Sequence, residues 1–513
     1  MFQFLLLFLR ITKLINVIGV FSLMDVRLSD DKLVSLKTPL LALACFESES
    51  MPDHLKDVDK ALQGEIAALF ESGNFKGELN QWRIIGGCGR LACDNVLLFG
   101  LGKKNDASLE ILRRASGTTA SLVRDKLGLS EFAIAFHMVE SGKPCKSMVQ
   151  AEVEGVLLGS YRYLKYKTVR EGLKSLKSLV VAGKGFENEI EKARVLAECA
   201  NLTRDLQNDP ASDLTPEKLA DAARELEKFG VSVQVFDKKQ IEALGLTALL
   251  AVNRGSVNEP RFVVMEYDGG GKRIALIGKG ITFDSGGLDI KPADGMLSMR
   301  MDMSGAAVVI GALRAAAMLK LKAHLFGVFA ATENMPGNNA YKPGDVVPTY
   351  SGKTIEIANT DAEGRVVLAD ALAYSEKHLK PEVMIDFATL TGACVVALGS
   401  VCAGVMGDDQ SIIDALKNAG EATGERVWQL PFYKEYLDQV KSEVADVRNL
   451  GIVPRQGGAI TAGAFLKAFV EKTPWAHIDI AGPAWADKSS GYTRKGGTGF
   501  GVRLAVEFIE RWK

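Results

Sequence analysis

Short apolar runs alternate with helically spaced segments along the chain after about residue 30. In the first part, Val96–Phe99 and Leu179–Ala182 have the length of buried strands and each is followed by glycine, whereas Glu110–Arg124 has helical spacing. Strands that alternate with helices across glycine turns are typical of an α/β layer with a largely parallel sheet. The first part of the chain is therefore predicted to be an α/β domain.

The same alternation returns in the second half of the chain. A helix is predicted over Ser304–Lys320, and Gly269–Lys272 is interpreted as a hairpin turn between Tyr267 and Ile274. The runs predicted to be strands are Val231–Phe236, Arg261–Tyr267, Arg273–Ile277, Ala323–Ala330 and Val383–Phe387. The fold class is therefore α/β with two domains, a smaller N-terminal α/β domain and a larger C-terminal one whose mixed, mainly parallel sheet lies between helices.

A helical segment marks the predicted boundary between the two domains. Helical spacing from Asn188 to Leu206 leads into Asn-Asp-Pro, and a proline stops a helix. Thr215, followed by Pro216, then has the pattern of a new helix start. We expect an N-terminal α/β domain over 25–185, a connecting helix over 186–209 and a catalytic domain over 210–513.

The first 24 residues are apolar and contain no acidic residue, but Arg10 and Lys13 interrupt them. The segment 1–24 is interpreted either as an N-terminal extension ahead of a natural start at Met24 or as a targeting or membrane segment. No run of 18 apolar residues follows Met24, so we expect no membrane segment in the main body.

The net charge and cysteine content of the chain limit the classes of function and the cellular location that we expect. The 513 residues carry a formal charge of −1, so the chain has no overall positive field and nucleic acid is an unlikely partner. The 7 cysteines form no CxxC pair and no regular framework, which favours reduced thiols and a cytoplasmic location.

Polar residues interrupt the second domain in three segments: Gly278–Gly287, Lys291–Asp302 and Asn359–Arg365. Each follows a predicted strand or opens a helix, where ligands of α/β sheets gather. If these segments meet, four acids would repel one another unless cations are bound or protons are taken up, and two divalent metal ions would cancel the charge. Those acids are Asp284, Asp302, Asp361 and Glu363.

The 5 histidines show no paired helical spacing, which argues against a histidine-based metal site. Oxygen ligands with the neutral amine of Lys279 would accept Mn²⁺, Zn²⁺, Mg²⁺ or Co²⁺, and the choice stays open. Other interpretations also stay open: Asp302 as a helix cap, Met299 as core filler, His477 as a hydrogen-bonded strand histidine and Asp479 as a residue that orients a loop.

The three segments resemble the leucyl aminopeptidase family of two-metal cytosol aminopeptidases. The family octapeptide Asn-Thr-Asp-Ala-Glu-Gly-Arg-Leu stands at 359–366 with Val366 as its last residue, and Gly278–Gly287 matches a second family motif. The resemblance extends to Ala388–Ala393 and Trp475–Gly482 and is weaker in the first domain. It implies a metal-dependent aminopeptidase that removes N-terminal residues, preferably leucine and other apolar residues, from short peptides.

The resemblance also implies roles for single residues. The tighter metal would be bound by Lys279, Asp284, Asp302 and Glu363, and the exchangeable metal by Asp284, Asp361 and Glu363. Lys291 would face the tetrahedral intermediate, and Arg365 would hold a bicarbonate that acts as general base. The substrate pocket would comprise Met299, Thr389, Leu390 through its carbonyl, Gly392, Ala481 and Ala484.

The family further implies a homohexamer. Two rival hypotheses are a DNA-binding protein on the same scaffold, which the near-zero charge does not favour, and an inactive interaction protein, which the complete set of acids disfavours.

Overall fold

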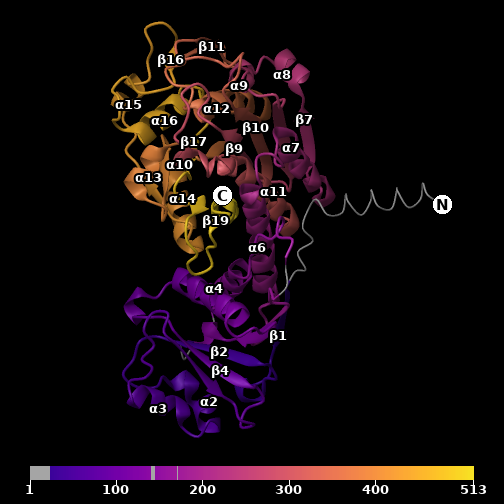
Figure 1. The fold of residues 1–513 in the computed structure, drawn as a ribbon, viewed down its shortest axis with the longest axis vertical. Helices are drawn as coiled ribbons and strands as arrows, with labels where there is room; N and C mark the ends of the chain where they lie inside the picture. The colour runs from indigo at the N-terminus through magenta and orange to yellow at the C-terminus, as the bar shows by residue number, and fades with distance from the viewer. Residues whose placement is uncertain (1–23, 140–144, 170–171, 513) are drawn as a thin grey trace, which may run out of the picture. The chain divides into compact units, whose positions relative to one another are not determined.

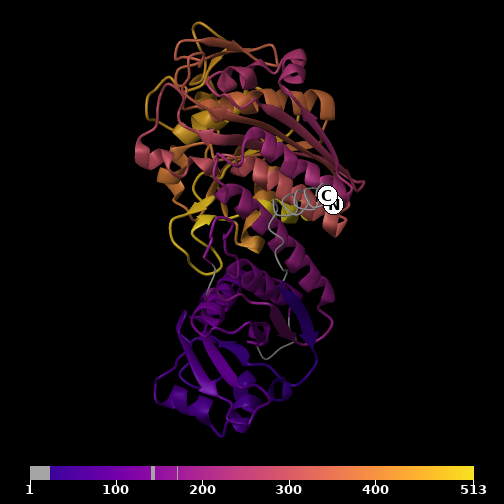
Figure 2. The same ribbon diagram turned by 45° about the vertical axis from the view of Figure 1, so that its right-hand side comes forward.

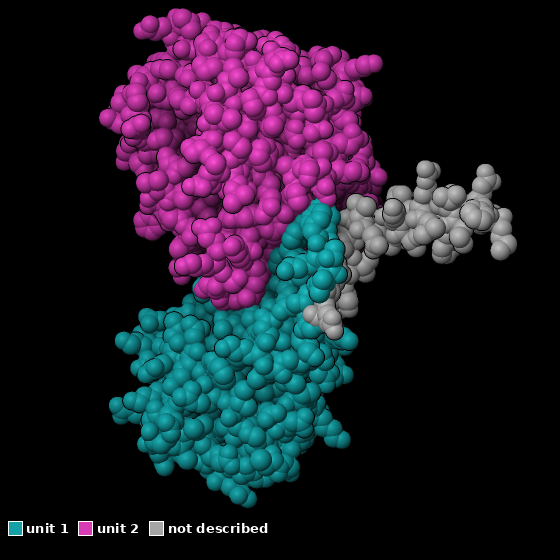
Figure 3. Space-filling view, in the orientation of Figure 1, with its two compact units in different colours: residues 1–193 teal, residues 194–513 magenta. Residues whose placement is uncertain are grey.

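The computed structural model describes residues 24–139, 145–169 and 172–512, so the interpretation of the first 24 residues lies outside it except for Met24. The chain divides into two compact units, residues 1–193 and 194–513, which are coloured separately in Figure 3. Helix α6 (Glu187–Asn208) spans the division.

The N-terminal unit is built on one six-stranded sheet in the order β1-β6-β5-β2-β4-β3. All neighbouring pairs are parallel except β3 with β4. The strands are β1 (Asp25–Ser29), β2 (Leu40–Cys45), β3 (Trp82–Gly86), β4 (Asn95–Gly100), β5 (Glu131–Ile134) and β6 (Ser178–Ala182). Its α-helices before α6 are α2 (Lys56–Ala61), α3 (Glu65–Glu71), α4 (Leu109–Asp125) and α5 (Lys146–Gly159). The predicted α/β layer is confirmed.

The C-terminal unit contains a mixed eight-stranded sheet in the order β15-β14-β17-β13-β9-β10-β8-β7. The central strands β17, β13, β9 and β10 run parallel. The strands are β7 (Ser232–Phe236), β8 (Arg261–Asp268), β9 (Arg273–Asp284), β10 (His324–Asn334), β13 (Val383–Ala388), β14 (Ala403–Gly407), β15 (Val427–Gln429) and β17 (Trp475–Asp479). Smaller sheets join β11 (Val346–Pro348), β12 (Thr354–Glu356) and β16 (Val447–Arg448), and β18 (Trp485–Ala486) with β19 (Gly496–Gly497).

Helices cover both faces of this sheet (Figures 1 and 2). Side chains alternate along β9, so that Ile274 and Leu276 join the core on one face while Ala275 and Ile277 join the core on the other. Helices α11 (Ser304–Leu319), α14 (Gln410–Thr423) and α17 (Val502–Arg511) contribute to the first core, and α9 (Thr247–Asn253), α12 (Glu363–Tyr374) and α16 (Gly458–Lys467) to the second. The remaining α-helices are α7 (Pro216–Arg224), α8 (Lys238–Leu244), α10 (Ala293–Met296), α13 (Gly392–Leu398) and α15 (Lys434–Asp438).

One local prediction is wrong, and one alternative that the sequence left open is excluded. Gly269–Lys272 is not a hairpin turn, because β10 lies between β8 and β9 and pairs with both. Asp302 does not cap α11, whose N-cap residue is Met303 and has no side-chain cap. Thr215 does cap α7, since its side chain accepts a hydrogen bond from the Lys218 nitrogen.

One helical stretch in the described part of the chain, Ala293–Leu319, is long and apolar enough to cross a membrane. However, 83% of its apolar window is buried inside the protein, and its longest helix, α11, belongs to the core. Its apolar character is therefore explained by packing within the unit.

Candidate functional site

The three polar segments meet at the carboxyl ends of the central strands of the C-terminal unit. Strand β9 continues seven residues beyond the predicted Ile277 and ends at Asp284, so Lys279 and Asp284 lie on a strand and not in a loop. Glu363 is the first residue of α12, so the octapeptide runs from a loop into the first turn of that helix. Parallel strands present their carboxyl ends at one edge, which explains why residues far apart in sequence converge there.

Lys279 lies in the most buried part of the site. Its ammonium nitrogen is 2.7 Å from Asp302 Oδ2 and 2.9 Å from Glu363 Oε1, and it donates to the Thr389 carbonyl oxygen at 3.0 Å. None of the three charged side chains is more than 4% exposed. A Cβ on Gly364 would come within 2.6 Å of the Lys279 nitrogen, so glycine leaves the space that the amine occupies.

Lys291 lies in a more open part of the same site. Its ammonium is 2.8 Å from Asp284 Oδ2 and 2.5 Å from Asp361 Oδ1. The turn that brings it there begins at Gly286, whose φ of +89° favours glycine, and the Lys291 main-chain nitrogen donates back to the Ser285 carbonyl at 2.9 Å. Oxygens of Asp284, Asp361 and Glu363 lie within 4.8 Å of one another, close enough to hold one metal ion.

Several pKa values in the site are shifted because acidic side chains lie close together and are largely buried. Burial and then the Asp284 carboxylate raise the pKa of Glu363 to about 8, and burial raises the pKa of Asp302 to about 6. Burial and Asp284 also raise the pKa of Asp361. Burial by itself would lower the pKa of Lys279, but the carboxylates of Asp302, Glu363 and Asp284 outweigh it and raise that pKa. Without a cation, Glu363 therefore holds a proton near neutral pH, and Lys279 is an ammonium.

Arg365 extends from the first turn of α12 and is buried. Its Nη1 donates to the Asn449 carbonyl oxygen at 2.9 Å, and burial lowers its pKa to about 10, which leaves it charged at neutral pH. The side chain of Asn449 accepts from the nitrogens of Ala358 and Asn359 and donates to the carbonyl of Asn359 at 2.7 Å. Asn449 thus contacts both the octapeptide segment and Arg365.

The residues assigned to the substrate pocket lie in different environments. Gly392 is exposed with open space where a Cβ would be, Met299, Leu390 and Ala481 are half-buried, and Thr389 and Ala484 are buried. Thr389 also donates from Oγ1 to Asp302 Oδ1 at 2.7 Å, so it orients an acid of the site.

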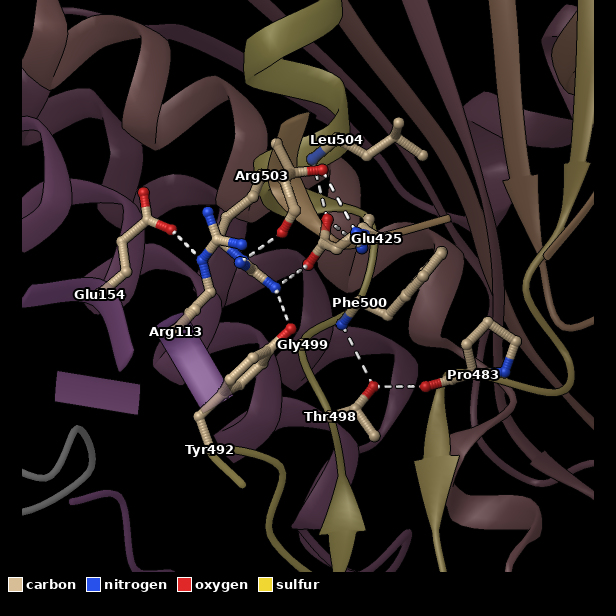
Figure 4. A network of polar contacts seen from close by, with 12 residues as sticks. Arg113, Glu154, Glu425, Pro483, Tyr492, Thr498, Gly499, Phe500, Arg503 and Leu504 are labelled. Carbon is tan, nitrogen blue, oxygen red and sulfur yellow. Dashed lines mark hydrogen bonds and ion pairs between the residues drawn. The ribbon is translucent and has the colours of Figure 1, made fainter. Parts of the chain in front are cut away.

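Asp479 connects the two loops that carry most of these residues. Its carboxylate accepts from the Leu390 nitrogen at 3.1 Å, the Thr391 hydroxyl at 2.7 Å and the Ala481 nitrogen at 3.1 Å. The loop after Ala481 is also held by Thr498, whose hydroxyl donates to the Pro483 carbonyl at 2.6 Å (Figure 4). The interpretation of Asp479 as a residue that orients a loop is confirmed.

His477 is a buried strand histidine, as expected. Its Nδ1 faces Asp386 Oδ1 at 2.6 Å, and Trp475 Nε1 donates to the other oxygen of Asp386 at 2.8 Å. Burial would lower the pKa of His477, but the Asp386 carboxylate outweighs it and raises that pKa.

Sequence reasoning missed three residues that organise the site: Asn334, Tyr341 and Asn449. Tyr341 donates from its hydroxyl to the Thr360 carbonyl at 2.8 Å, and Asn334 donates to the same oxygen at 3.0 Å. The sequence feature that could have identified Asn334 is its position shortly after the predicted strand Ala323–Ala330, where polar residues of a ligand site are expected.

The fold and the acidic cluster define an α/β protein with a candidate divalent-cation site. Residues 201–506 match the catalytic domain of the cytosol aminopeptidase family, and residues 42–170 match the N-terminal domain of that family. The chain belongs to the cytosol aminopeptidase family, whose members are metal-dependent peptidases.

Relatives and solved structures agree with this assignment. The chain is 44% identical to a probable cytosol aminopeptidase of Geobacter sp. (strain M21), over 95% of this chain and 100% of the relative. It is 45% identical to a probable cytosol aminopeptidase of Roseiflexus castenholzii, over 93% and 97%.

Two solved structures share the fold. The bottromycin maturation enzyme BotP in complex with Mn has a TM-score of 0.82 and 33% identity, covering 92% of this chain and 99% of that one. A mutant of tomato leucine aminopeptidase has a TM-score of 0.85 and 32% identity, covering 95% and 96%.

Proposed function

We propose that this chain removes N-terminal residues, preferably leucine and other apolar residues, from short peptides with the help of two divalent cations. The cations would be Mn²⁺ or Zn²⁺, with Mg²⁺ and Co²⁺ as alternatives. Their ligands would be Lys279, Asp284, Asp302, Asp361 and Glu363. This proposal rests above all on the buried cluster in which four acids face two lysines.

The donor set fits such cations. Among the described residues, four buried carboxylate oxygens have no hydrogen-bond donor other than a lysine ammonium: Asp302 Oδ2, Asp361 Oδ1 and both of Glu363. Three of them are ion-paired with a lysine, and Glu363 Oε2 has neither kind of partner among the described residues. A buried carboxylate oxygen without a donor, such as Glu363 Oε2, is costly unless a cation is bound, which supports this part of the site as a cation centre.

The difference in burial supports a tight and an exchangeable position. The Asp302 and Lys279 side chains are each 4% exposed, whereas that of Asp361 is 34% exposed. A cation held by Asp361 would exchange with cations in the surrounding solution more readily than one held by Asp302. When bound, the cations would supply a water nucleophile that ionises near neutral pH and would polarise the scissile carbonyl.

Lys291 would stabilise negative charge that develops on the carbonyl oxygen. Burial would lower the pKa of Lys291, but Asp284 and Glu363 outweigh it and raise that pKa, so the ammonium remains charged at neutral pH. It is already held in place by Asp284 and Asp361. A fixed cationic donor of this kind favours the transition state over the bound substrate.

Arg365 would hold a bicarbonate that accepts a proton from the attacking water. The acids of the cluster would be bound to cations, and none of the three polar segments contains a histidine, so an anion is a reasonable base. One guanidinium edge is already fixed by the Asn449 carbonyl, while Arg365 Nε has no hydrogen-bond partner in the described part of the chain. This arrangement supports a bound anion at the free donor.

The first side chain of the peptide would contact Met299, Thr389, Gly392, Ala481 and Ala484, and the Leu390 carbonyl would accept a hydrogen bond from the substrate. The mostly apolar character of this set supports a preference for apolar residues. Asp479 would keep the two loops of the pocket at a fixed separation.

We propose a cytoplasmic homohexamer. Large apolar side chains of the catalytic unit are exposed, among them Leu297 at 84%, Val396 on α13 at 90% and Val401 at 69%. Burial of such side chains against another copy of the chain would favour an assembly. Sedimentation analysis of the purified protein would detect the assembly.

Hydrolysis of leucine anilide by metal-stripped protein, measured before and after addition of Mn²⁺, tests the activity. We expect activity only after the addition. Full turnover by protein in which elemental analysis finds no divalent cation would refute the proposal.

A further inference from the structure

Asn334 lies directly beside the acidic cluster, although no motif includes it. It is the last residue of β10 and pairs with Asp284, the last residue of β9. The register between the two strands shifts between Thr332 and Glu333, an irregularity that redirects the side chains that follow it. The side chain of Asn334 is fully buried.

The carboxamide of Asn334 connects two segments that are distant in sequence. Its Nδ2 donates to Asp284 Oδ1 at 2.8 Å and to the Thr360 carbonyl at 3.0 Å. The Thr360 carbonyl and a carboxylate at Asp284 can only accept hydrogen bonds. The amide nitrogen of Asn334, which carries two hydrogens, must therefore face them. The main-chain carbonyl of Asn334 also accepts from the nitrogen and hydroxyl of Ser285, at 3.0 and 2.7 Å.

These bonds fix the direction of the Asp284 carboxylate. Oδ1 accepts from Asn334 and from the Gly286 nitrogen at 2.9 Å, so it is occupied by two donors. Oδ2 is thereby turned towards Lys291 and the cluster. Because Thr360 precedes Asp361, the same amide nitrogen also sets the separation between the segments that carry Asp284 and Asp361.

We propose that Asn334 is a positioning residue of the divalent-cation site, which holds Asp284 and Asp361 at the separation that a cation requires without contacting the cation. This inference rests on the proposed two-metal function. Residues that orient metal ligands through hydrogen bonds typically change metal affinity by about 10- to 100-fold when they are removed.

The test compares two buried asparagines. Asn334→Leu removes both donors at similar size and unchanged charge. Asn253→Leu is the matched control, because Asn253 is also buried and its Nδ2 also donates twice, to the Asn258 carbonyl at 2.8 Å and to Thr332 Oγ1 at 3.0 Å on the same strand β10. Mn²⁺ affinity of the metal-stripped full chain is measured by titration calorimetry, and thermal stability by circular dichroism.

We expect both variants to lose thermal stability, but only Asn334→Leu to lose Mn²⁺ affinity, by about 10-fold or more. Unchanged affinity of Asn334→Leu, or an equal loss in both variants, would overturn the inference. If Asn334→Leu does not fold, Asn334→Ser replaces it, since a serine hydroxyl is too short to reach both acceptors, and unchanged affinity of that variant counts against the inference. Failure of the unmodified chain to bind Mn²⁺ would instead overturn the proposed function.

Discussion

Gly364→Ala places a methyl group against the amine of Lys279. The new Cβ would lie 2.5 Å from Lys279 Cε and 2.6 Å from its nitrogen, well inside van der Waals contact. The lysine side chain is only 4% exposed, so its ammonium cannot move into water and must leave Asp302, Glu363 and the Thr389 carbonyl. Loss of one partner from a buried ion pair costs about 3 to 5 kcal/mol.

Replacement of a helical glycine by alanine stabilises the helix by at most about 1 kcal/mol. We therefore expect a net loss of about 2 to 4 kcal/mol in the free energy of unfolding. Turnover of leucine anilide and Mn²⁺ affinity should fall together, because the displaced amine belongs to the proposed ligand set. Gly463→Ala on α16 is the control, since the nearest atom to its Cβ would be the flexible Met406 sulfur at 3.1 Å, with Phe432 in ordinary contact at 3.5 Å. Full activity and Mn²⁺ affinity of Gly364→Ala would refute the assigned position of the Lys279 amine.

Further predictions concern the catalytic groups and pH. Lys291→Met should lower kcat about 10²- to 10³-fold with a smaller effect on KM, as expected for loss of a donor to the developing charge; equal effects on substrate and transition-state binding would contradict this role. Arg365→Ala should abolish the dependence of activity on bicarbonate, and an unmodified enzyme that is equally active with and without bicarbonate would refute that role. The pKa of Glu363 is raised to about 8 by burial, so the folded metal-free chain binds more protons than the unfolded chain between its ordinary pKa of 4.5 and about 8. The free energy of unfolding of the metal-free chain should therefore fall as pH rises through that window. Thermal unfolding experiments in which the stability of this chain rises over the same pH range would contradict the assignment.

The strands of the C-terminal sheet could be predicted from apolar runs, but the full length of β9 could not. Gly278 and Gly280 lie within the part of the strand beyond Ile277, and glycine usually signals a turn. The structure supplies the reason: a Cβ on Gly278 would meet the backbone of α11 at 2.5 Å. Close packing of a helix on the strand therefore selects a residue that sequence reasoning associates with loops.

The acids of the site could be identified from the sequence because each stands in a short polar segment next to a predicted strand. Their supporting asparagines could not. Asn334 and Asn449 are uncharged single residues whose contacts depend on pairing between segments 26 to 91 residues apart. The strand order that inserts β10 between β8 and β9 creates the first of these contacts, and this order was the feature mispredicted as a hairpin.

The charge balance of the cluster leads to a final prediction about protons. Four carboxylates face two ammonium groups, so the fully ionised cluster carries two net negative charges. The raised pKa values of Glu363 and Asp302 show that protons relieve part of this charge when no cation is bound. A divalent cation would replace those protons, and the Lys279 amine must also lose its proton before it can be a ligand.

Binding of Mn²⁺ to the metal-stripped chain near pH 7 should therefore release protons, from Lys279 and from the fraction of Glu363 that is protonated. Calorimetric titrations in buffers that differ in ionisation enthalpy measure this release. Glu363→Gln removes one source and should lower the release to the contribution of Lys279 and of the small protonated fraction of Asp302, as long as the variant still binds Mn²⁺. Tight Mn²⁺ binding with no proton release would mean that Lys279 stays an ammonium and is not a ligand.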